Sequence, residues 1–303
     1  MERLIKAIKT CKNPTVAGLD PKLSYIPETI REDAYRQYGK TPAGAAAAIL
    51  RFNRGIIDAL AGIVPAVKPQ CAYYEAFGWE GVRALAETIA YAREKGLYVI
   101  TDGKRNDIGT TMEAYAAAHL GENCVEDEVF SPFGADALTV NGYLGTDGIA
   151  PLLKVCGKLD RSIFVLVKTS NPSSGELQDR VLQSGETVYR AMGAMCEQWG
   201  EENRGASGYS RVGAVVGATY PEQLRELREA LPHTFFLVPG YGAQGGGGKD
   251  VAPAFDADGI GAVVNSSRGI LCAWQKSGGD FMEAAAKEAC RMRDEISEAI
   301  AAR

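Results

Sequence analysis

Acidic and basic residues alternate directly after the apolar run at residues 97–100 of this chain. Asp102 and Lys104 lie two positions apart, so on an extended backbone their side chains point to one face and can contact the same ligand. Asp107 follows in the loop beyond the predicted strand. Such a cluster could place charge against a reacting group and transfer a proton. The simpler alternative is an ordinary salt-bridged strand end.

Short apolar runs alternate with helical stretches along the whole chain, and this alternation predicts the fold. The runs occupy residues 15–19, 63–67, 97–101, 135–140, 162–167, 212–216, 234–238 and 261–264. Long helices are predicted at residues 42–60, 80–95, 176–199 and 280–301. We therefore expect an α/β protein, a (β/α)8 TIM barrel in which residues 1–303 form a single catalytic domain. A doubly wound open sheet would show the same alternation, but the number of strands favours closure.

Two loop insertions interrupt this pattern. Residues 22–40 are charged and contain tyrosines, and residues 200–210 are polar and contain glycine. Long loops of this kind often cover active sites. Either segment could therefore form part of a lid.

The composition narrows the class of protein. A net charge of -5 and a pI near 5.3 argue against nucleic acid as a partner. The seven cysteines are odd in number and form no C-x-x-C pair, which is typical of reduced thiols. No apolar run approaches the ~18 residues of a membrane span, and the first residues do not resemble a signal peptide. We expect a cytoplasmic protein without membrane contact.

Polar residues follow most of the predicted strands, at the end of the barrel where TIM-barrel enzymes carry their active sites. Asp20 and Lys68 follow the first and second strands, so both are expected in one mouth with Asp102 and Lys104. Opposite charges so close together should keep one another ionised near neutral pH and titrate as a coupled set. An ionised lysine in this mouth could donate a proton.

A glycine-rich turn follows the seventh strand, and its residues 240–245 formally match the dinucleotide pattern G-x-G-x-x-G. That pattern belongs in a first βαβ unit, whereas this turn lies near the C-terminus and continues through further glycines. We expect instead that its backbone N–H groups, with Gln244, Gly245 and Arg268, bind a phosphate. The two histidines lack metal-ligand spacing, so we expect no metal.

With these residues in place, the chain resembles the orotidine 5'-phosphate decarboxylase family, and its longer bacterial-type branch in particular. The family motif D-x-K-x-x-D-I-x-x-T is present without a gap as Asp102, Lys104, Asp107, Ile108 and Thr111. Further matches to the family pattern are Asp20, Lys68, Ser170 and Asn171, Gln244 with the adjoining Gly245, and Arg268. The match spans almost the whole predicted barrel.

The resemblance implies decarboxylation of orotidine 5'-phosphate to UMP and CO2, the final step of pyrimidine synthesis, without a cofactor. Asp102 would face the substrate carboxylate, and Lys104 would stabilise and then protonate the carbanion at C6. Lys68 and Asp107 would complete the charged network. The resemblance also implies a homodimer in which Asp107 and Ile108 reach the neighbouring active site.

The resemblance assigns the remaining residues to substrate binding. Asp20, Lys68, Asp107 and Thr111 would bind the ribose. Ser170 and Asn171 would contact the pyrimidine, and Gln244, Gly245 and Arg268 would hold the phosphate.

Two other functions remain open from the residues alone. A class I aldolase would use Lys68, Lys104 or Lys168 as a Schiff-base lysine, although a flanking carboxylate disfavours the neutral amine that this chemistry needs. A non-catalytic barrel would bind a phosphorylated ligand without turnover. Such a barrel gains nothing from an acid placed against its ligand's own anion.

Overall fold

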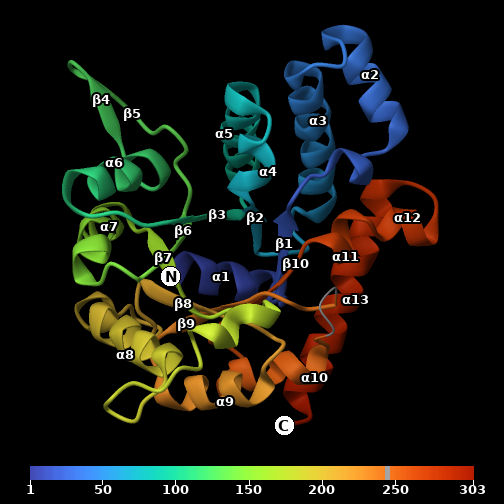
Figure 1. The fold of residues 1–303 in the computed structure, drawn as a ribbon. Helices are drawn as coiled ribbons and strands as arrows, with labels where there is room; N and C mark the ends of the chain where they lie inside the picture. Colours follow the sequence, from blue (N-terminus) through green and yellow to red (C-terminus); the bar gives the residue numbers. More distant parts are fainter. Residues whose placement is uncertain (243–245) are drawn as a thin grey trace.

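Parallel strands form a closed barrel in the computed structural model, which describes residues 1–242 and 246–303 (Figure 1). Their order around the barrel is β1-β10-β9-β8-β7-β6-β3-β2, and β1 pairs with both β2 and β10. The strands are β1 Thr15–Leu19, β2 Ala66–Pro69, β3 Tyr98–Arg105, β6 Ala137–Val140, β7 Ser162–Lys168, β8 Val212–Val216, β9 Phe235–Val238 and β10 Ala262–Ser266. This closure confirms the predicted TIM barrel and excludes the open sheet.

Helices surround the barrel, and local sequence signals fix where the long ones begin. The helices are α1 Glu2–Cys11, α2 Glu28–Tyr38, α3 Pro42–Leu60, α4 Cys71–Glu75, α5 Gly78–Glu94, α6 Gly109–His119, α7 Thr146–Leu159, α8 Val188–Gly200, α9 Pro221–Ala230, α10 Gly248–Val251, α11 Arg268–Leu271, α12 Ala273–Ser277 and α13 Phe281–Ala301. Thr41 caps α3 by accepting from the Gly44 N–H, and Asp280 caps α13. The predicted helix at 42–60 is confirmed at both ends.

Alternate residues of each strand point into the barrel, and this period of two positions the site. Val16, Ala66, Ile100 and Ala137 belong to the inner core cluster. Their intervening neighbours pack outward beneath the helices. Two positions further along each strand, the inward residues are Gly18, Lys68, Asp102 and Thr139. The strand pattern thus carries polar side chains onto the floor of the C-terminal mouth.

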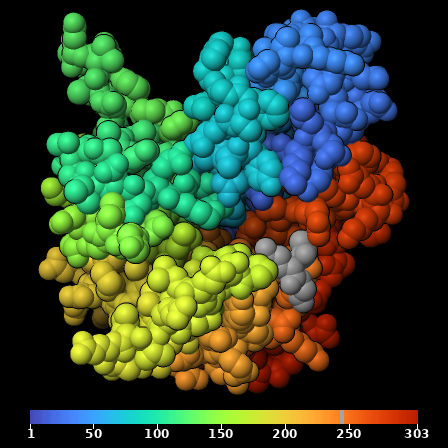
Figure 2. Space-filling model, viewed as in Figure 1, coloured from blue at the N-terminus to red at the C-terminus, as the bar shows by residue number. Residues whose placement is uncertain are grey.

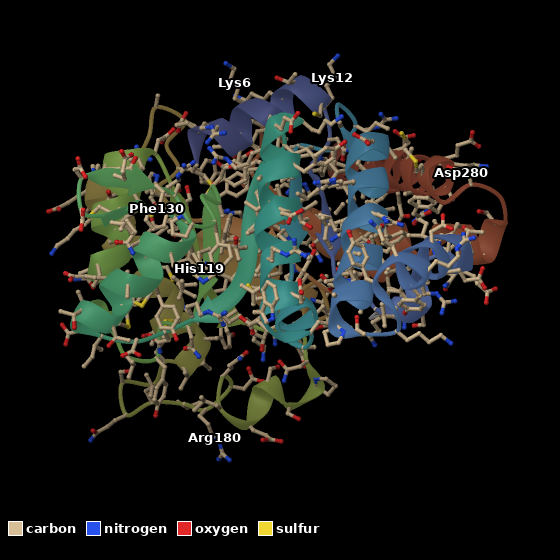
Figure 3. The ribbon with its side chains drawn as sticks, turned by 90° about the horizontal axis from the view of Figure 1, so that it is seen from above. Lys6, Lys12, His119, Phe130, Arg180 and Asp280 are labelled. Carbon is tan, nitrogen blue, oxygen red and sulfur yellow. The ribbon has the colours of Figure 1, made fainter. Side chains whose placement is uncertain are left out.

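Helix α1 lies across the opposite end of the barrel. Its residues Leu4 and Ile5 are buried in the inner cluster, against the first layer of strand residues. In Figure 3, Lys6 and Lys12 of α1 mark this end, and Arg180 marks the far end of the molecule. The C-terminal mouth therefore faces away from α1.

Two predicted elements are wrong in part. The strand expected at 63–67 begins only at Ala66, and the preceding residues form a turn that ends at Pro65. The helix expected at 176–199 begins at Val188. Before it, the chain forms the short 3-10 helix η2 Pro172–Glu176 and an irregular loop, whose residues bond to the end of β7 instead of to a helix.

The insertions lie at opposite ends of the barrel. Residues 22–40 follow β1 and form the 3-10 helix η1 Leu23–Tyr25 together with α2, on the side of the mouth. Residues 200–210 connect α8 to the start of β8, and the Ser207 N–H donates to Glu2 of α1 at 3.1 Å. The prediction that residues 200–210 could form a lid is wrong, because an αβ connection lies at the end remote from the mouth.

A β-hairpin between α6 and β6 is not indicated by the predicted alternation. Strands β4 Asn123–Val125 and β5 Glu128–Phe130 pair antiparallel and stand clear of the molecule in Figures 1 and 2. The hairpin residues Val125, Val129 and Phe130 are exposed.

Among residues 1–242 and 246–303, none of the helices combines the length and the hydropathy of a membrane-spanning segment. All seven cysteines lie in these ranges as free thiols.

Candidate active site

Asp102 lies between two lysines on the floor of the mouth. Lys68 Nζ donates to Asp102 Oδ2 at 2.5 Å, and Lys104 Nζ donates to Asp102 Oδ1 at 2.6 Å. The side chains of Lys68 and Asp102 are only 5% and 8% exposed, whereas that of Lys104 is 45% exposed. The structure thus places one lysine beneath the acid and the other at the solvent side, where a ligand could reach it.

The lysines keep Asp102 ionised despite its burial. Burial alone raises the pKa of Asp102, but the charges and hydrogen bonds of Lys68 and Lys104 outweigh it and hold the pKa well below its usual range. For Lys68 the signs are reversed. Burial lowers its pKa, but the carboxylates of Asp102 and Asp20 more than compensate, so the pKa of Lys68 is raised. The predicted mutual ionisation is confirmed for Asp102 and Lys68.

Two neutral side chains complete the hydrogen bonds of Asp102. Gln70 Nε2 donates to Oδ2 at 2.9 Å, and the Thr139 hydroxyl donates to Oδ1 at 2.7 Å. Neither residue was among the predicted site residues. Both follow signals in the sequence: Gln70 comes two residues after Lys68, and Thr139 is the inward position of the fourth barrel strand.

The backbone of β3 is irregular at the site. Its pairing with β6 shifts between Thr101 and Arg105, and Lys104 has a φ of 48°, in the left-handed region. This conformation costs a residue with a side chain about 1 kcal/mol or more. Lys104 lies within this shifted stretch, and its side chain contacts the same carboxylate as Lys68.

A cavity of about 370 Å³ opens above these residues, within the size range of small-ligand sites. Its polar lining includes Asp20, Lys68, Gln70, Tyr73, Asp102, Tyr241, Asn265, Ser267 and Arg268. Oδ1 of Asp20 and Oδ1 of Asn265 are buried and have no hydrogen-bond partner among the described residues. Arg268 is exposed at the start of α11. The cavity therefore combines free acceptors with a cation, as a phosphorylated sugar requires.

Of the motif residues, Asp102 lines this cavity, Lys104 contacts Asp102 without lining the cavity itself, and the other three lie further away. Asp107 Oδ1 accepts from the Ile108 N–H at 2.8 Å, and the described residues offer Asp107 no ion pair with Lys68 or Lys104. Ile108 is the N-cap of α6 and is 51% exposed. Thr111 is exposed on the first turn of that helix. The structure of one chain does not bring Asp107, Ile108 and Thr111 into the cluster.

The predicted pyrimidine contacts lie on the loop after β7. Asn171 Oδ1 accepts from Thr169 Oγ1 at 2.6 Å, and the Ser170 carbonyl accepts from Thr219 Oγ1 at 3.2 Å. Ser170 and Asn171 do not line the cavity. Two predicted phosphate contacts, at positions 244 and 245, lie outside the described residues.

All three candidate Schiff-base lysines are ion-paired. Lys68 and Lys104 share Asp102, and Lys168 Nζ lies 2.6 Å from Asp179 Oδ1. A paired ammonium is protonated and cannot attack a carbonyl. The geometry therefore does not support the aldolase alternative. Within the described residues, no group of His, Cys, Asp and Glu is arranged to hold a metal ion.

Comparison with known proteins identifies the family of the chain. Residues 52–277 match the model of the orotidine 5'-phosphate decarboxylase / HUMPS family. An orotidine 5'-phosphate decarboxylase from Rhodopirellula baltica is 49% identical over 90% of this chain and 88% of its own length. The chain belongs to the orotidine 5'-phosphate decarboxylase family.

Other members of the decarboxylase family match almost the whole chain. The orotidine 5'-phosphate decarboxylase of Clostridium acetobutylicum is 40% identical, and the alignment covers 98% of each chain. The solved structure of Leishmania donovani OMP decarboxylase has a TM-score of 0.74 and 30% identity, and covers 100% of this chain and 98% of its own. The resemblance noted from the decarboxylase motif is confirmed.

Proposed function

We propose that this chain decarboxylates orotidine 5'-phosphate to UMP and CO2, with Lys104 as the proton donor. The observation that supports this assignment most strongly is the position of Asp102, which is buried, ionised and held between Lys68 and Lys104 beneath the cavity. Family membership supports the same reaction. A carboxylate held next to the carboxylate of a substrate favours a reaction in which the substrate group leaves as CO2.

In the proposed reaction, the bond between C6 of the pyrimidine and its carboxylate carbon breaks, and CO2 leaves. The electron pair stays on C6, where the Lys104 ammonium stabilises it and then donates a proton to form UMP. Solvent afterwards reprotonates the Lys104 amine, whose side chain is half exposed. Asp102 faces the substrate carboxylate, so its repulsion is relieved as CO2 departs.

One charge interaction is not enough for the reaction. Two unit charges ~4 Å apart interact by about 4 kcal/mol at an effective dielectric of 20, or roughly three decades in rate. We propose that binding of the ribose by Asp20 and of the phosphate by Arg268 supplies further stabilisation. These roles are supported by the buried Asp20 oxygen, to which the described part of the chain offers no hydrogen-bond donor, and by the exposed Arg268. Gln244 and Gly245 remain predicted phosphate contacts, and Ser170 and Asn171 predicted pyrimidine contacts.

We further propose a homodimer in which each chain completes the other's active site. Asp107, Ile108 and Thr111 belong to the decarboxylase motif, yet within one chain they lie outside the charged cluster. An exposed Ile108 at the start of α6 is suited to contact a second chain. The whole chain, residues 1–303, would form one catalytic domain of each subunit, and its free cysteines suit the cytoplasm.

To test the reaction, purified protein is mixed with orotidine 5'-phosphate in the presence of a chelator, and the loss of orotate absorbance is followed. We expect turnover in the parent protein, none in Lys104→Ala, and retained UMP binding in that variant. Lys158→Ala is the matched control, because Lys158 lies on the exposed surface of α7, where it pairs with Glu122. An inactive parent protein would refute the activity, and an active Lys104→Ala would refute the proton donor.

A further inference from the structure

The Thr139 hydroxyl connects the acid and the lysine of the proposed reaction. Its Oγ1 accepts from the Lys104 backbone N–H at 3.0 Å and donates to Asp102 Oδ1 at 2.7 Å. A hydroxyl has a single proton, and since the backbone N–H occupies its acceptor side, that proton points to the carboxylate. Thr139 is 1% exposed, so water does not compete for these bonds.

The fold fixes the place of this hydroxyl. Ala137 of β6 belongs to the inner core cluster, whereas Leu138 and Val140 belong to the outer one, so Thr139 points into the barrel. The register shift in β3 lies directly opposite, between Thr101 and Arg105. The Thr139 side chain therefore takes the backbone hydrogen bond of the residue that has the left-handed conformation.

We propose that Thr139 is a positioning residue that keeps Asp102 oriented and ionised when Lys104 gives its proton to the substrate. In the structure, Oδ1 of Asp102 has two side-chain donors, Lys104 and Thr139. The Lys104 ammonium, on a half-exposed side chain, gives its proton to C6 in the proposed reaction and so loses the charge with which it binds Oδ1. The buried Thr139 hydroxyl keeps its proton and its hydrogen bond to Oδ1. This inference rests on the proposed function.

The other oxygen of Asp102 has two donors of its own. Lys68 and Gln70 both donate to Oδ2, and Lys68 is buried. Lys68 from β2 and Lys104 from β3 pair with Asp102, and Asp20 after β1 acts on Lys68. The Cys71 thiol of α4 lies near Asp102, and Arg268 lines the same cavity. Thr139 of β6 is neutral, so its hydrogen bond to Oδ1 adds no charge near the substrate.

Thr139→Val tests the proposal, since valine keeps the shape and removes the hydroxyl. Loss of a hydrogen bond to a charged group should lower kcat about tenfold to a hundredfold, with a smaller change in KM. The acid limb of the pH–rate profile should move to higher pH, because the charged form of Asp102 loses a donor. Thr139→Ser keeps the hydroxyl and should restore both quantities.

Thr101→Val is the matched control. Thr101 precedes Asp102 on the same strand and is buried, but its hydroxyl has no hydrogen-bond partner among the described residues. Its kcat and pH profile should equal those of the parent protein. A folded Thr139→Val protein with unchanged kcat and acid limb, or one that loses only thermal stability, would overturn the proposal. An inactive parent protein would instead refute the proposed function, so the two failures are distinguishable.

Discussion

Lys168 Nζ lies 2.6 Å from Asp179 Oδ1, and this pair joins a wholly buried cation to an exposed loop. The Lys168 side chain is 0% exposed at the end of β7, whereas that of Asp179 is 45% exposed. Lys168 also lies over the ring of Tyr220, 4.4 Å from its centroid. The loop between them contains Ser170 and Asn171, so the pair holds the predicted pyrimidine contacts above the barrel.

The unequal burial predicts unequal effects of breaking this pair. Asp179→Ala leaves a buried ammonium without its counter-ion, and we expect a loss of about 3 kcal/mol in the free energy of unfolding. Lys168→Met leaves only a half-exposed carboxylate, which water can solvate, and should cost about 1 kcal/mol or less. Urea unfolding of both variants measures the difference. Equal losses would contradict the expected difference between a buried ammonium and a half-exposed carboxylate.

The ionised Asp102 predicts how stability depends on pH. The pKa of Asp102 is lower in the folded protein than in the unfolded chain. As the pH falls below about 4, the unfolded chain therefore takes up this proton before the folded protein does. The stabilisation is therefore complete above the unfolded pKa and is lost as the pH falls toward the folded pKa. Asp102 changes the free energy of unfolding by at most about 1.4 kcal/mol per pH unit.

Asp102→Asn should remove this part of the pH dependence. At neutral pH the variant should be less stable than the parent, because Lys68 loses its buried counter-ion. Its stability should fall less steeply between about pH 5 and pH 3. Asp33→Asn, on the surface of α2, is the control and should keep the parent slope. Parallel curves for Asp102→Asn and the parent would contradict the assignment.

Gly18 on β1 lies so close to the cavity wall that a side chain should disturb the site. A Cβ at this position would lie 2.8 Å from Cβ of Ser267 and 3.0 Å from Oδ1 of Asn265. Gly18→Ala should therefore destabilise the protein by about 1–3 kcal/mol and raise KM, because Ser267 precedes Arg268. Gly157→Ala on α7 meets open space and should stabilise by about 0.5–1 kcal/mol. Thermal unfolding and KM distinguish the two, and an unchanged KM in Gly18→Ala would argue against a ligand at this wall.

The proposed sharing of active sites in a homodimer predicts complementation between two inactive proteins. Lys104→Ala and Asp107→Ala each damage every site of their own homodimer. A mixed dimer has one site with both defects and one intact site, so mixing equal amounts after dissociation should restore about one quarter of the parent activity. Activity assays before and after mixing measure this. A tag on one variant shows whether mixed dimers have formed. If they have formed and activity is not restored, the two chains do not share their active sites.

Much of the fold follows from local sequence patterns. The apolar runs locate all eight barrel strands, because a strand buried on both faces must be continuously apolar. The α3 and α13 helices begin at caps that the sequence displays, at Thr41 and Asp280. The segment before Val188 does not form the helix that its pattern predicts. Its side chains bond to Lys168 and Thr169 at the end of β7, and a helical pattern does not show such long-range partners.

The sequence by itself determined the barrel, the family and the charged strand ends at Asp20, Lys68, Asp102 and Lys104. Each depends on residue types, spacing and strand period, which are properties of the chain read in order. Only the tertiary structure decided which donors share the Asp102 carboxylate, that residues 200–210 lie at the end opposite the mouth, and that Thr139 bonds to both Asp102 and Lys104. Those relationships depend on the register between neighbouring strands and on a local shift in β3, where a displacement of one residue turns a side chain to the other face.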